Sequence, residues 1–340
     1  MKERKKYIDI VKGVAILAIT FLHYEEGVIP AGLNTWIGSW MITAFYFTLG
    51  WLHGLSEKEV SLRELIRKRW RSLGIPYLWF TAIILCFDGL LVWAGYYEPK
   101  VVAVDFYKAL CLRGIGALWF LPALFAGEVI FIFLKNKRTA YKLLFLAIAV
   151  SYFWLYGRWH NQYTDGSDLV KIIDAPFYAL RNMLSAAIVV YAGYIICVKS
   201  EKFLPRLSTG KWGLLGMGLL TLSYLAAVYL HDILPGFVNK DIVWMFFAPI
   251  IGPYGWVLLA RSAEGWAVNR FFVFWGKNSL ILMATHYSIL LVLCRILDAA
   301  LTGGEAFTGV RTIYWFILTL LVEYPIVYFI NQKAKFLLGK

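Results

Sequence analysis

The chain of 340 residues is 60% hydrophobic and only 16% charged, whereas a typical soluble domain is about 45–50% apolar and about 25% charged. These proportions exclude a soluble globular enzyme, because 21 acidic and 34 basic residues supply too little polar surface for a water-soluble protein of this size. The net charge of +13 does not indicate a nucleic-acid partner, since the basic residues form short clusters between apolar segments that hold the aromatic residues.

Apolar segments of membrane-crossing length predict an all-α, polytopic integral membrane protein with about ten transmembrane helices. The basic start of the chain and its first short apolar core resemble a signal peptide, but no small-residue cleavage site follows, so we expect this segment to be retained as the first span. We expect a single integral domain, residues 1–340. The predicted spans are residues 8–24, 36–55, 74–95, 117–134, 140–157, 177–198, 212–230, 242–260, 278–297 and 311–331.

The positions of Lys and Arg between these spans predict the orientation of the chain. If the N-terminus is cytoplasmic, 24 of the 34 basic residues fall on the inner side, seven fall in outer loops and three lie within spans. This bias predicts that both termini are cytoplasmic and that the protein is a multi-pass protein of the cytoplasmic membrane. The four cysteines are far apart, mostly within apolar segments, and are expected to be packing residues.

The first predicted span carries three ionisable side chains, Asp9, Lys12 and His23, that share one helix face. Such groups are costly inside a membrane and need a partner, a wet cavity or a function. Lys12 and His23 are eleven residues apart, or about 16 Å along a helix, which suits a long, thin ligand with a negatively charged head entering from the cytoplasm. Alternatively, Asp9 and Lys12 form an ion pair at the interface and His23 caps the helix among waters.

Other ionisable residues lie in or near later spans. Asn278 and Ser279 are expected to cap the ninth span, with His286 near mid-membrane, where it either serves the function or hydrogen-bonds to a neighbouring helix. Glu128 and Arg181 either pair with each other or line the same cavity. Three further ionisable residues near span ends are expected to extend their polar groups to the membrane–water interface: His53, Asp88 and Arg295.

Three motifs in chain order resemble the membrane acyltransferase 3 family, especially its fucose 4-O-acetylase-like branch. They are the segment 8–17 followed by His23, the segment 118–125, and the segment 276–280 followed by His286. Two positions differ from the usual family pattern. Leu49 replaces a serine, and Lys12 stands where many members have arginine, which keeps a phosphate ligand but loses the two-pronged guanidinium.

The resemblance implies transfer of an acyl group, usually acetyl, from cytoplasmic acyl-CoA to a hydroxyl of a cell-surface or lipid-linked carbohydrate, without a metal. His23 would then act as the general base or as a covalent acyl carrier, and Glu26 would orient its ring. The cofactor-binding residues would be Asp9, Lys12, Arg67 and Arg69, with Lys12 and the arginines holding the phosphates, and the acceptor side would include Arg113, Trp119, Arg181, Asn278, Ser279 and His286.

Two other classes of membrane protein share this general pattern. A transporter or flippase for a glycan or lipid-linked substrate also has many spans with buried charges, but the matched broken helices of an inverted repeat are not found in this sequence. A glycan polymerase or ligase normally has large outer loops, and the longest outer loops expected here have about twenty residues, far below domain size.

Overall fold

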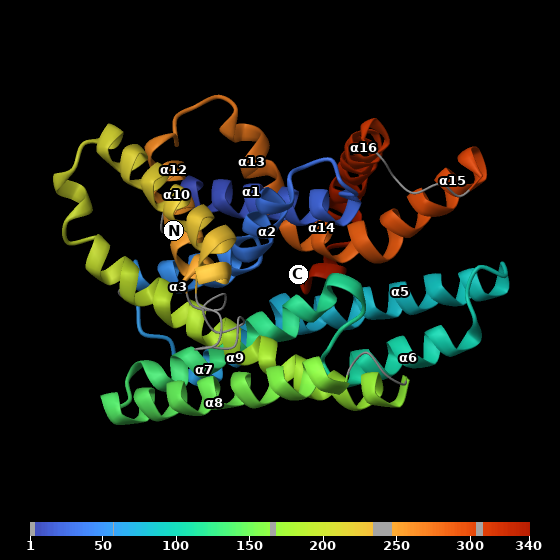
Figure 1. The fold of residues 1–340 in the computed structure, drawn as a ribbon, viewed down its shortest axis with the longest axis horizontal. Helices are drawn as coiled ribbons and strands as arrows, with labels where there is room; N and C mark the ends of the chain where they lie inside the picture. Colours follow the sequence, from blue (N-terminus) through green and yellow to red (C-terminus); the bar gives the residue numbers. More distant parts are fainter. Residues whose placement is uncertain (1–3, 57, 164–167, 234–246, 304–308) are drawn as a thin grey trace. The chain divides into compact units, whose positions relative to one another are not determined.

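The computed structural model describes residues 4–56, 58–163, 168–233, 247–303 and 309–340, and this part of the chain consists of helices and turns without a β-strand (Figure 1). The predicted all-α class is confirmed. The contacts divide the chain into two compact units. The first comprises residues 1–59, 188–282 and 306–316, and the second comprises residues 60–187, 283–305 and 317–340.

Close backbone contact between α1 and α13 organises the first unit. A Cβ atom on Gly13 would lie 1.9 Å from the carbonyl oxygen of Phe272, and one on Gly276 would lie 1.9 Å from the carbonyl oxygen of Asp9. Small residues therefore let these two helices touch backbone to backbone, which fixes the rotation of α1 about its own axis. The helices of this unit are α1 (Lys6–Tyr24), α2 (Ala31–Trp40), α3 (Thr43–Gly54), α10 (Thr209–Ile233), α12 (Ala248–Ser262) and α13 (Asn269–Lys277).

Hydrogen bonds and an ion pair connect the helices of the second unit. Tyr77 on α5 donates a hydrogen bond to the carbonyl of Ala109 on α6, at 2.7 Å. Glu128 on α7 is completely buried and is paired with Arg69 on α4. The helices are α4 (Leu62–Arg69), α5 (Ile75–Trp93), α6 (Pro99–Leu110), α7 (Phe120–Lys135), α8 (Thr139–Tyr163) and α15 (Val292–Thr302), with a π-helical turn at Trp70–Gly74, a 3₁₀ turn at Gly116–Trp119, a second π-helical turn at His286–Leu291 and a final 3₁₀ turn at Lys335–Leu338.

Three helices contain residues of both units. They are α9 (Asp168–Ser200), α14 (Ser279–Thr285) and α16 (Val310–Lys333). Pro176 lies inside α9 and Pro325 inside α16. Because proline removes one intrahelical hydrogen bond, each of these long helices has a weak point in its backbone.

Eight helical segments of the described chain are long and apolar enough to cross a membrane, so the protein is a polytopic integral membrane protein. These segments correspond to eight of the ten predicted spans and several extend beyond the predicted ends. They are Lys6–Tyr24, Leu62–Trp93, Gly116–Lys135, Thr139–His160, Leu169–Ser200, Thr209–Tyr229, Ser279–Thr302 and Val310–Lys333.

The other two predicted spans differ from the structure. The prediction of one continuous helix at 36–55 is wrong, because a turn at Met41 and Ile42 separates α2 from α3. The predicted span 242–260 begins outside the described residues, and α12 covers its later part from Ala248. Hydropathy alone does not show where an apolar segment turns.

Large apolar side chains are exposed along the spanning helices. Trp93 on α5 is 86% exposed, Leu214 on α10 is 74% exposed and Leu301 on α15 is 78% exposed. Side chains of this kind are normally buried in soluble proteins. Their exposure on helices, whose backbone groups are satisfied internally, fits contact with lipid.

Replacing Gly276 with Ala tests the contact between α1 and α13. The added methyl group would meet the backbone of α1, and because backbone cannot move aside cheaply, Gly276→Ala should destabilise the fold by about 1–3 kcal/mol. The readout is the melting temperature of the purified protein in detergent. Gly38→Ala is the matched control, since a Cβ on Gly38 meets nothing within 4 Å, and it should leave the melting temperature unchanged or higher. Equal melting temperatures for the two variants would contradict the close contact.

Candidate functional site

A cavity of about 630 Å³ lies at the N-terminal end of α1, within the first unit. We call it the basic cavity, because three of its lining side chains are cationic and one is acidic. Its remaining walls come from the end of α3 and the residues that follow it. It is lined by Arg4, Lys5, Ile8, Asp9, Lys12, Leu52, Leu55 and Ser56.

The acidic side chain of the basic cavity is bound to one of its cations. Arg4 donates from Nε to Oδ2 of Asp9 at 2.6 Å and from Nη2 to Oδ1 at 2.8 Å. This hydrogen bond to Asp9 raises the pKa of Arg4. The lining side chains include three cations and one acid, so the cavity has an excess of positive charge, which suits a phosphate-bearing ligand.

His23 lies in the last turn of α1, eleven residues and about 16 Å from Lys12 along the helix. Its side chain is half-buried, and its ring forms a hydrogen bond with the backbone of Ile19, one turn earlier. A hydrogen bond from one ring nitrogen to a backbone carbonyl fixes the tautomer and leaves the other nitrogen as an acceptor. The basic cavity and His23 therefore occupy opposite ends of one helix.

The predicted orienting role of Glu26 assumes that α1 continues for one more turn beyond His23, and this assumption is wrong. Helix α1 ends at Tyr24, and Glu25 already has extended backbone angles, so Glu26 does not lie one helical turn beyond His23. The neighbouring Glu25 organises the loop instead. It accepts hydrogen bonds from the backbone N–H of Val28 at 2.7 Å and of Ile29 at 3.1 Å, and from Nδ2 of Asn34 at 2.7 Å. The orienting role of Glu26 stays a prediction without a helical basis.

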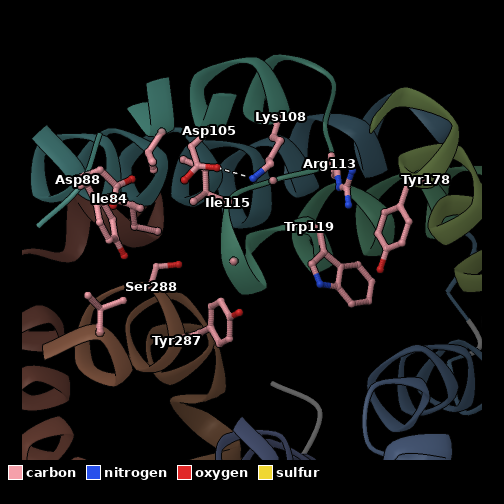
Figure 2. Close-up of a pocket in the computed structure, with 15 residues that line it drawn as sticks. Ile84, Asp88, Asp105, Lys108, Arg113, Ile115, Trp119, Tyr178, Tyr287 and Ser288 are labelled. Atoms are coloured by element: carbon pink, nitrogen blue, oxygen red, sulfur yellow. Dashed lines mark hydrogen bonds and ion pairs between the residues drawn. The ribbon is translucent and has the colours of Figure 1, made fainter. Parts of the chain in front are cut away.

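A second cavity, of about 350 Å³, lies within the second unit, and we call it the polar pocket (Figure 2). Arg113 and Trp119, both predicted as acceptor contacts, line it. His286 is completely buried in the neighbouring π-helical turn and does not line the pocket, whereas the two residues after it do. The polar pocket is lined by Ile84, Asp88, Tyr97, Val101, Asp105, Lys108, Arg113, Gly114, Ile115, Gly116, Trp119, Tyr178, Tyr287, Ser288 and Val292.

A tight loop forms one wall of the polar pocket. Leu112 has φ of 59°, Gly114 of 70° and Gly116 of 52°, all in the left-handed region that favours glycine. A Cβ on Gly116 would also lie 2.2 Å from Oγ of Ser288. The loop can therefore approach the π-helical turn only because glycine stands at this position, and this approach places Ser288 and Arg113 around the same cavity.

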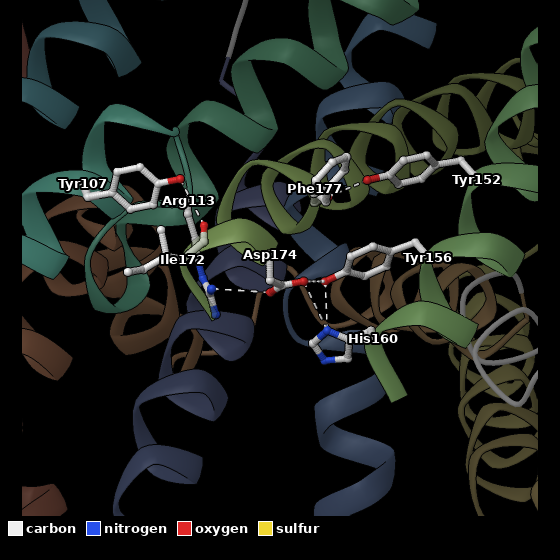
Figure 3. A network of polar contacts seen from close by, with 8 residues as sticks. All are labelled: Tyr107, Arg113, Tyr152, Tyr156, His160, Ile172, Asp174 and Phe177. Carbon is white, nitrogen blue, oxygen red and sulfur yellow. Dashed lines mark hydrogen bonds and ion pairs between the residues drawn. The ribbon is translucent and has the colours of Figure 1, made fainter. Parts of the chain in front are cut away.

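Arg113 belongs to a polar network that extends beyond the pocket (Figure 3). Its Nη1 atom lies 3.4 Å from Oδ2 of Asp174, and its guanidinium lies 4.7 Å from the ring centre of Tyr178. The other oxygen of Asp174 accepts a hydrogen bond from the hydroxyl of Tyr156 at 2.7 Å and lies 3.3 Å from Nδ1 of His160. Asp174 thus connects the pocket arginine to a histidine on the adjacent helix.

Asp174, His160 and Tyr178 were not among the residues predicted for the site. On α9, Asp174, Tyr178 and Arg181 follow one another at spacings of four and three residues and therefore share one face. That spacing indicates a polar helix face in the sequence, but Asp174 lies outside the predicted span 177–198. Arg181, predicted as an acceptor contact, lies half-buried on this face.

The prediction that Asp88 reaches the membrane–water interface is wrong. Only 4% of its surface is exposed, and it lines the polar pocket. Nearby, burial raises the pKa of Tyr97, and the charges of Asp88 and Asp105 add to the effect. Tyr97 lines the polar pocket as a neutral hydroxyl that can donate a hydrogen bond.

One of the two α4 arginines that were predicted to bind the cofactor has a structural role. Arg69, predicted to bind the cofactor, forms a two-point ion pair with the buried carboxylate of Glu128, with Nη2 to Oε1 at 2.7 Å. The expected alternatives for Glu128 had involved Arg181, not Arg69. Arg67 is exposed on α4. An arginine that neutralises a buried acid is held in place by the fold and has less freedom to bind a phosphate.

At the start of the ninth span, Asn278 stands between α13 and α14. Its carbonyl accepts the first backbone hydrogen bonds of α14, while its side-chain Nδ2 donates to the carbonyl of Phe274 at 2.8 Å. Asn278 thus secures the end of α13 as well as the start of α14, where Ser279 is the first residue. Among the described residues, no group of three or more His, Cys, Asp or Glu is placed to hold a metal ion.

Comparison with known proteins gives one match. A family model described as "Acyltransferase domain" matches residues 5–332, nearly the whole chain. The match includes both the helix that carries Lys12 and His23 and the segments that line the polar pocket. No curated protein and no solved structure matches the chain.

Separate replacement of Arg69 and Arg67 tests the structural role of the ion pair. Arg69→Met leaves the Glu128 carboxylate buried without its partner, which should cost about 3–5 kcal/mol. Arg67→Met is the control, because removing an exposed side chain typically changes stability by no more than about 0.5 kcal/mol. Thermal unfolding in detergent measures both. A stable Arg69→Met protein with weakened acyl-CoA binding would instead support the predicted cofactor role.

Proposed function

Because the chain belongs to the acyltransferase domain family, and is therefore a membrane acyltransferase, we propose that it transfers an acetyl group from cytoplasmic acetyl-CoA to a hydroxyl of a cell-surface or lipid-linked carbohydrate. We place it in the cytoplasmic membrane with both termini inside. The observation that carries this proposal is the basic cavity at one end of α1 together with His23 at the other end.

The charge of the basic cavity and the distance along α1 support the binding of acetyl-CoA. Lys12 and Lys5 provide charge-assisted contacts for the phosphates of acetyl-CoA in the basic cavity. The pantetheine arm then runs along α1, and the distance of about 16 Å between Lys12 and His23 brings the thioester toward the imidazole. Because Gly13 holds α1 against α13, this face of the helix has a fixed direction.

The chemical step is acyl transfer with His23 as general base. A neutral imidazole is well matched to removing a proton near pH 7. One ring nitrogen of His23 takes the proton of the acceptor hydroxyl while the oxygen of that hydroxyl attacks the carbonyl carbon of the thioester. The carbon–sulfur bond then breaks, and the departing CoA sulfur takes the proton back from the imidazolium, which gives the acetyl ester and free CoA.

A covalent route through His23 is the alternative mechanism. In that route the ring nitrogen attacks the thioester first, CoA leaves, and the acceptor hydroxyl then takes the acyl group from the histidine. The two routes differ in one kinetic property. A covalent carrier allows exchange between acetyl-CoA and labelled CoA without an acceptor, whereas a general base does not.

Replacement of His23 tests the base. His23→Ala should lower acetyl transfer by about a hundredfold to ten-thousandfold, the usual contribution of a general base, while the protein remains folded in the membrane. The measurement is acetyl-CoA turnover by the purified protein in detergent. His53→Ala provides a histidine control on another helix and should keep near-normal activity. Normal turnover by His23→Ala would remove His23 from the mechanism.

Replacement of Lys12 tests the phosphate contact. Lys12→Ala should raise the KM for acetyl-CoA about tenfold to a hundredfold, since a hydrogen bond to a charged group is worth about 1.5–3 kcal/mol, with a smaller effect on kcat. Lys12→Arg should restore much of the affinity, because a guanidinium also binds phosphate. Lys6→Ala removes an exposed charge on the same helix outside the cavity and should leave KM unchanged. An unchanged KM in Lys12→Ala would contradict the assignment.

A further inference from the structure

Asp88 is a buried carboxylate that the protein itself does not satisfy. Its residue is 4% exposed, and its Oδ2 atom has no hydrogen-bond partner among the described residues. A buried polar atom left without a partner typically costs about 1–3 kcal/mol, and more when it is charged. Such a group calls for an explanation. Because Asp88 lines the polar pocket, a bound molecule can donate a hydrogen bond to its carboxylate group.

The other charged groups that line the pocket have partners within the second unit. Lys108 donates to Oδ1 of Asp105 at 2.7 Å, and Arg113 is paired with Asp174. Arg295 does not line the pocket, and its positive charge changes the pKa of Tyr97 less than the negative charge of Asp88 does. The charge that these pairs leave uncompensated in the pocket is therefore the negative charge of Asp88. This balance favours an uncharged ligand that donates hydrogen bonds and disfavours an anion.

Aromatic side chains give the pocket flat surfaces. Trp119 and Tyr178 lie beside each other at one end of the pocket, and Asp88 lies toward the other end (Figure 2). The pocket volume of about 350 Å³ is at the small end of the range of about 300–1,000 Å³ that is usual for small-molecule sites. Aromatic faces with one polar edge suit a ligand that is apolar on one side and rich in hydroxyls on the other.

We propose that the polar pocket binds the acceptor sugar as an uncharged pyranoside ring, with Asp88 accepting hydrogen bonds from its hydroxyls and Trp119 and Tyr178 contacting its apolar face. This assignment rests on the proposed function, since it identifies the class of acceptor. It also makes Asp88 a specificity residue. A sugar that carries its own carboxylate would place a second negative charge beside Asp88 and would be rejected.

Ligand-observed saturation-transfer NMR on the full-length protein in detergent tests this assignment. The probes are the methyl pyranosides of glucose, galactose, mannose and fucose, and the methyl glycosides of glucuronic and galacturonic acid. At least one neutral glycoside should bind, and both uronic acids should bind at least tenfold more weakly. In Asp88→Asn, which keeps the shape of the side chain, the neutral glycoside should bind at least tenfold more weakly and most of the penalty against the uronic acids should disappear.

Glu98→Gln is the matched control. Glu98 is an exposed acid that follows α5, is paired with Lys100 and does not line the pocket. Its replacement should leave binding of the neutral glycoside unchanged. The assignment is overturned if none of the glycosides binds the wild-type protein, if the uronic acids bind as well as the neutral sugars, or if Asp88→Asn binds like Glu98→Gln.

Acetyl-CoA binding, measured on the same samples, separates this inference from the proposed function. Wild-type protein that binds acetyl-CoA but no glycoside refutes the acceptor pocket and leaves the donor site standing. Protein that binds a neutral glycoside through Asp88 but does not bind acetyl-CoA refutes the proposed function and leaves the sugar site standing. Retained acetyl-CoA binding by Asp88→Asn also shows that this variant is folded.

Discussion

The contact between the backbones of α1 and α13 is the constraint on which the proposed acetyl-CoA site depends. Gly13 and Gly276 remove the side chains that would separate the two helices, so α1 has one rotation about its axis. That rotation directs Lys12 into the basic cavity and sets the position of His23 eleven residues later. A rigid helix is a precise way to hold two groups at a fixed spacing, because its rise per residue does not vary.

Charge pairing is the second principle of the structure. Arg4 neutralises Asp9, Arg69 neutralises Glu128, and Arg113 is paired with Asp174. In a protein surrounded by lipid, an unpaired ionised group is expensive, so such pairs are expected wherever the function does not need the charge. The exceptions then become informative. One such exception is Asp88, whose Oδ2 atom has no hydrogen-bond partner among the described residues, and a bound ligand explains its arrangement better than the fold does.

Much of the fold could be predicted from the sequence, because a long apolar segment in lipid has to satisfy its own backbone as a helix. The break between α2 and α3 could not, since residues 36–55 are mostly apolar and hydropathy carries no information about a turn. In the candidate site, the spacing of Lys12 and His23 follows from helix geometry alone. The pairing of Asp174 with His160 and the burial of Asp88 depend on how neighbouring helices are rotated, which sequence spacing does not determine.

The central claim is that α1 guides a CoA thioester to residue 23. The most direct measurement is the alkylation of His23→Cys by bromoacetyl-CoA, located by mass spectrometry, with Leu22→Cys as the control because residue 22 is about 100° away around the same helix. The account predicts rapid labelling at position 23, little at position 22, and protection by desulfo-CoA, which lacks the reactive thiol. Equal labelling of both positions, or labelling at position 23 that desulfo-CoA does not block, would contradict it.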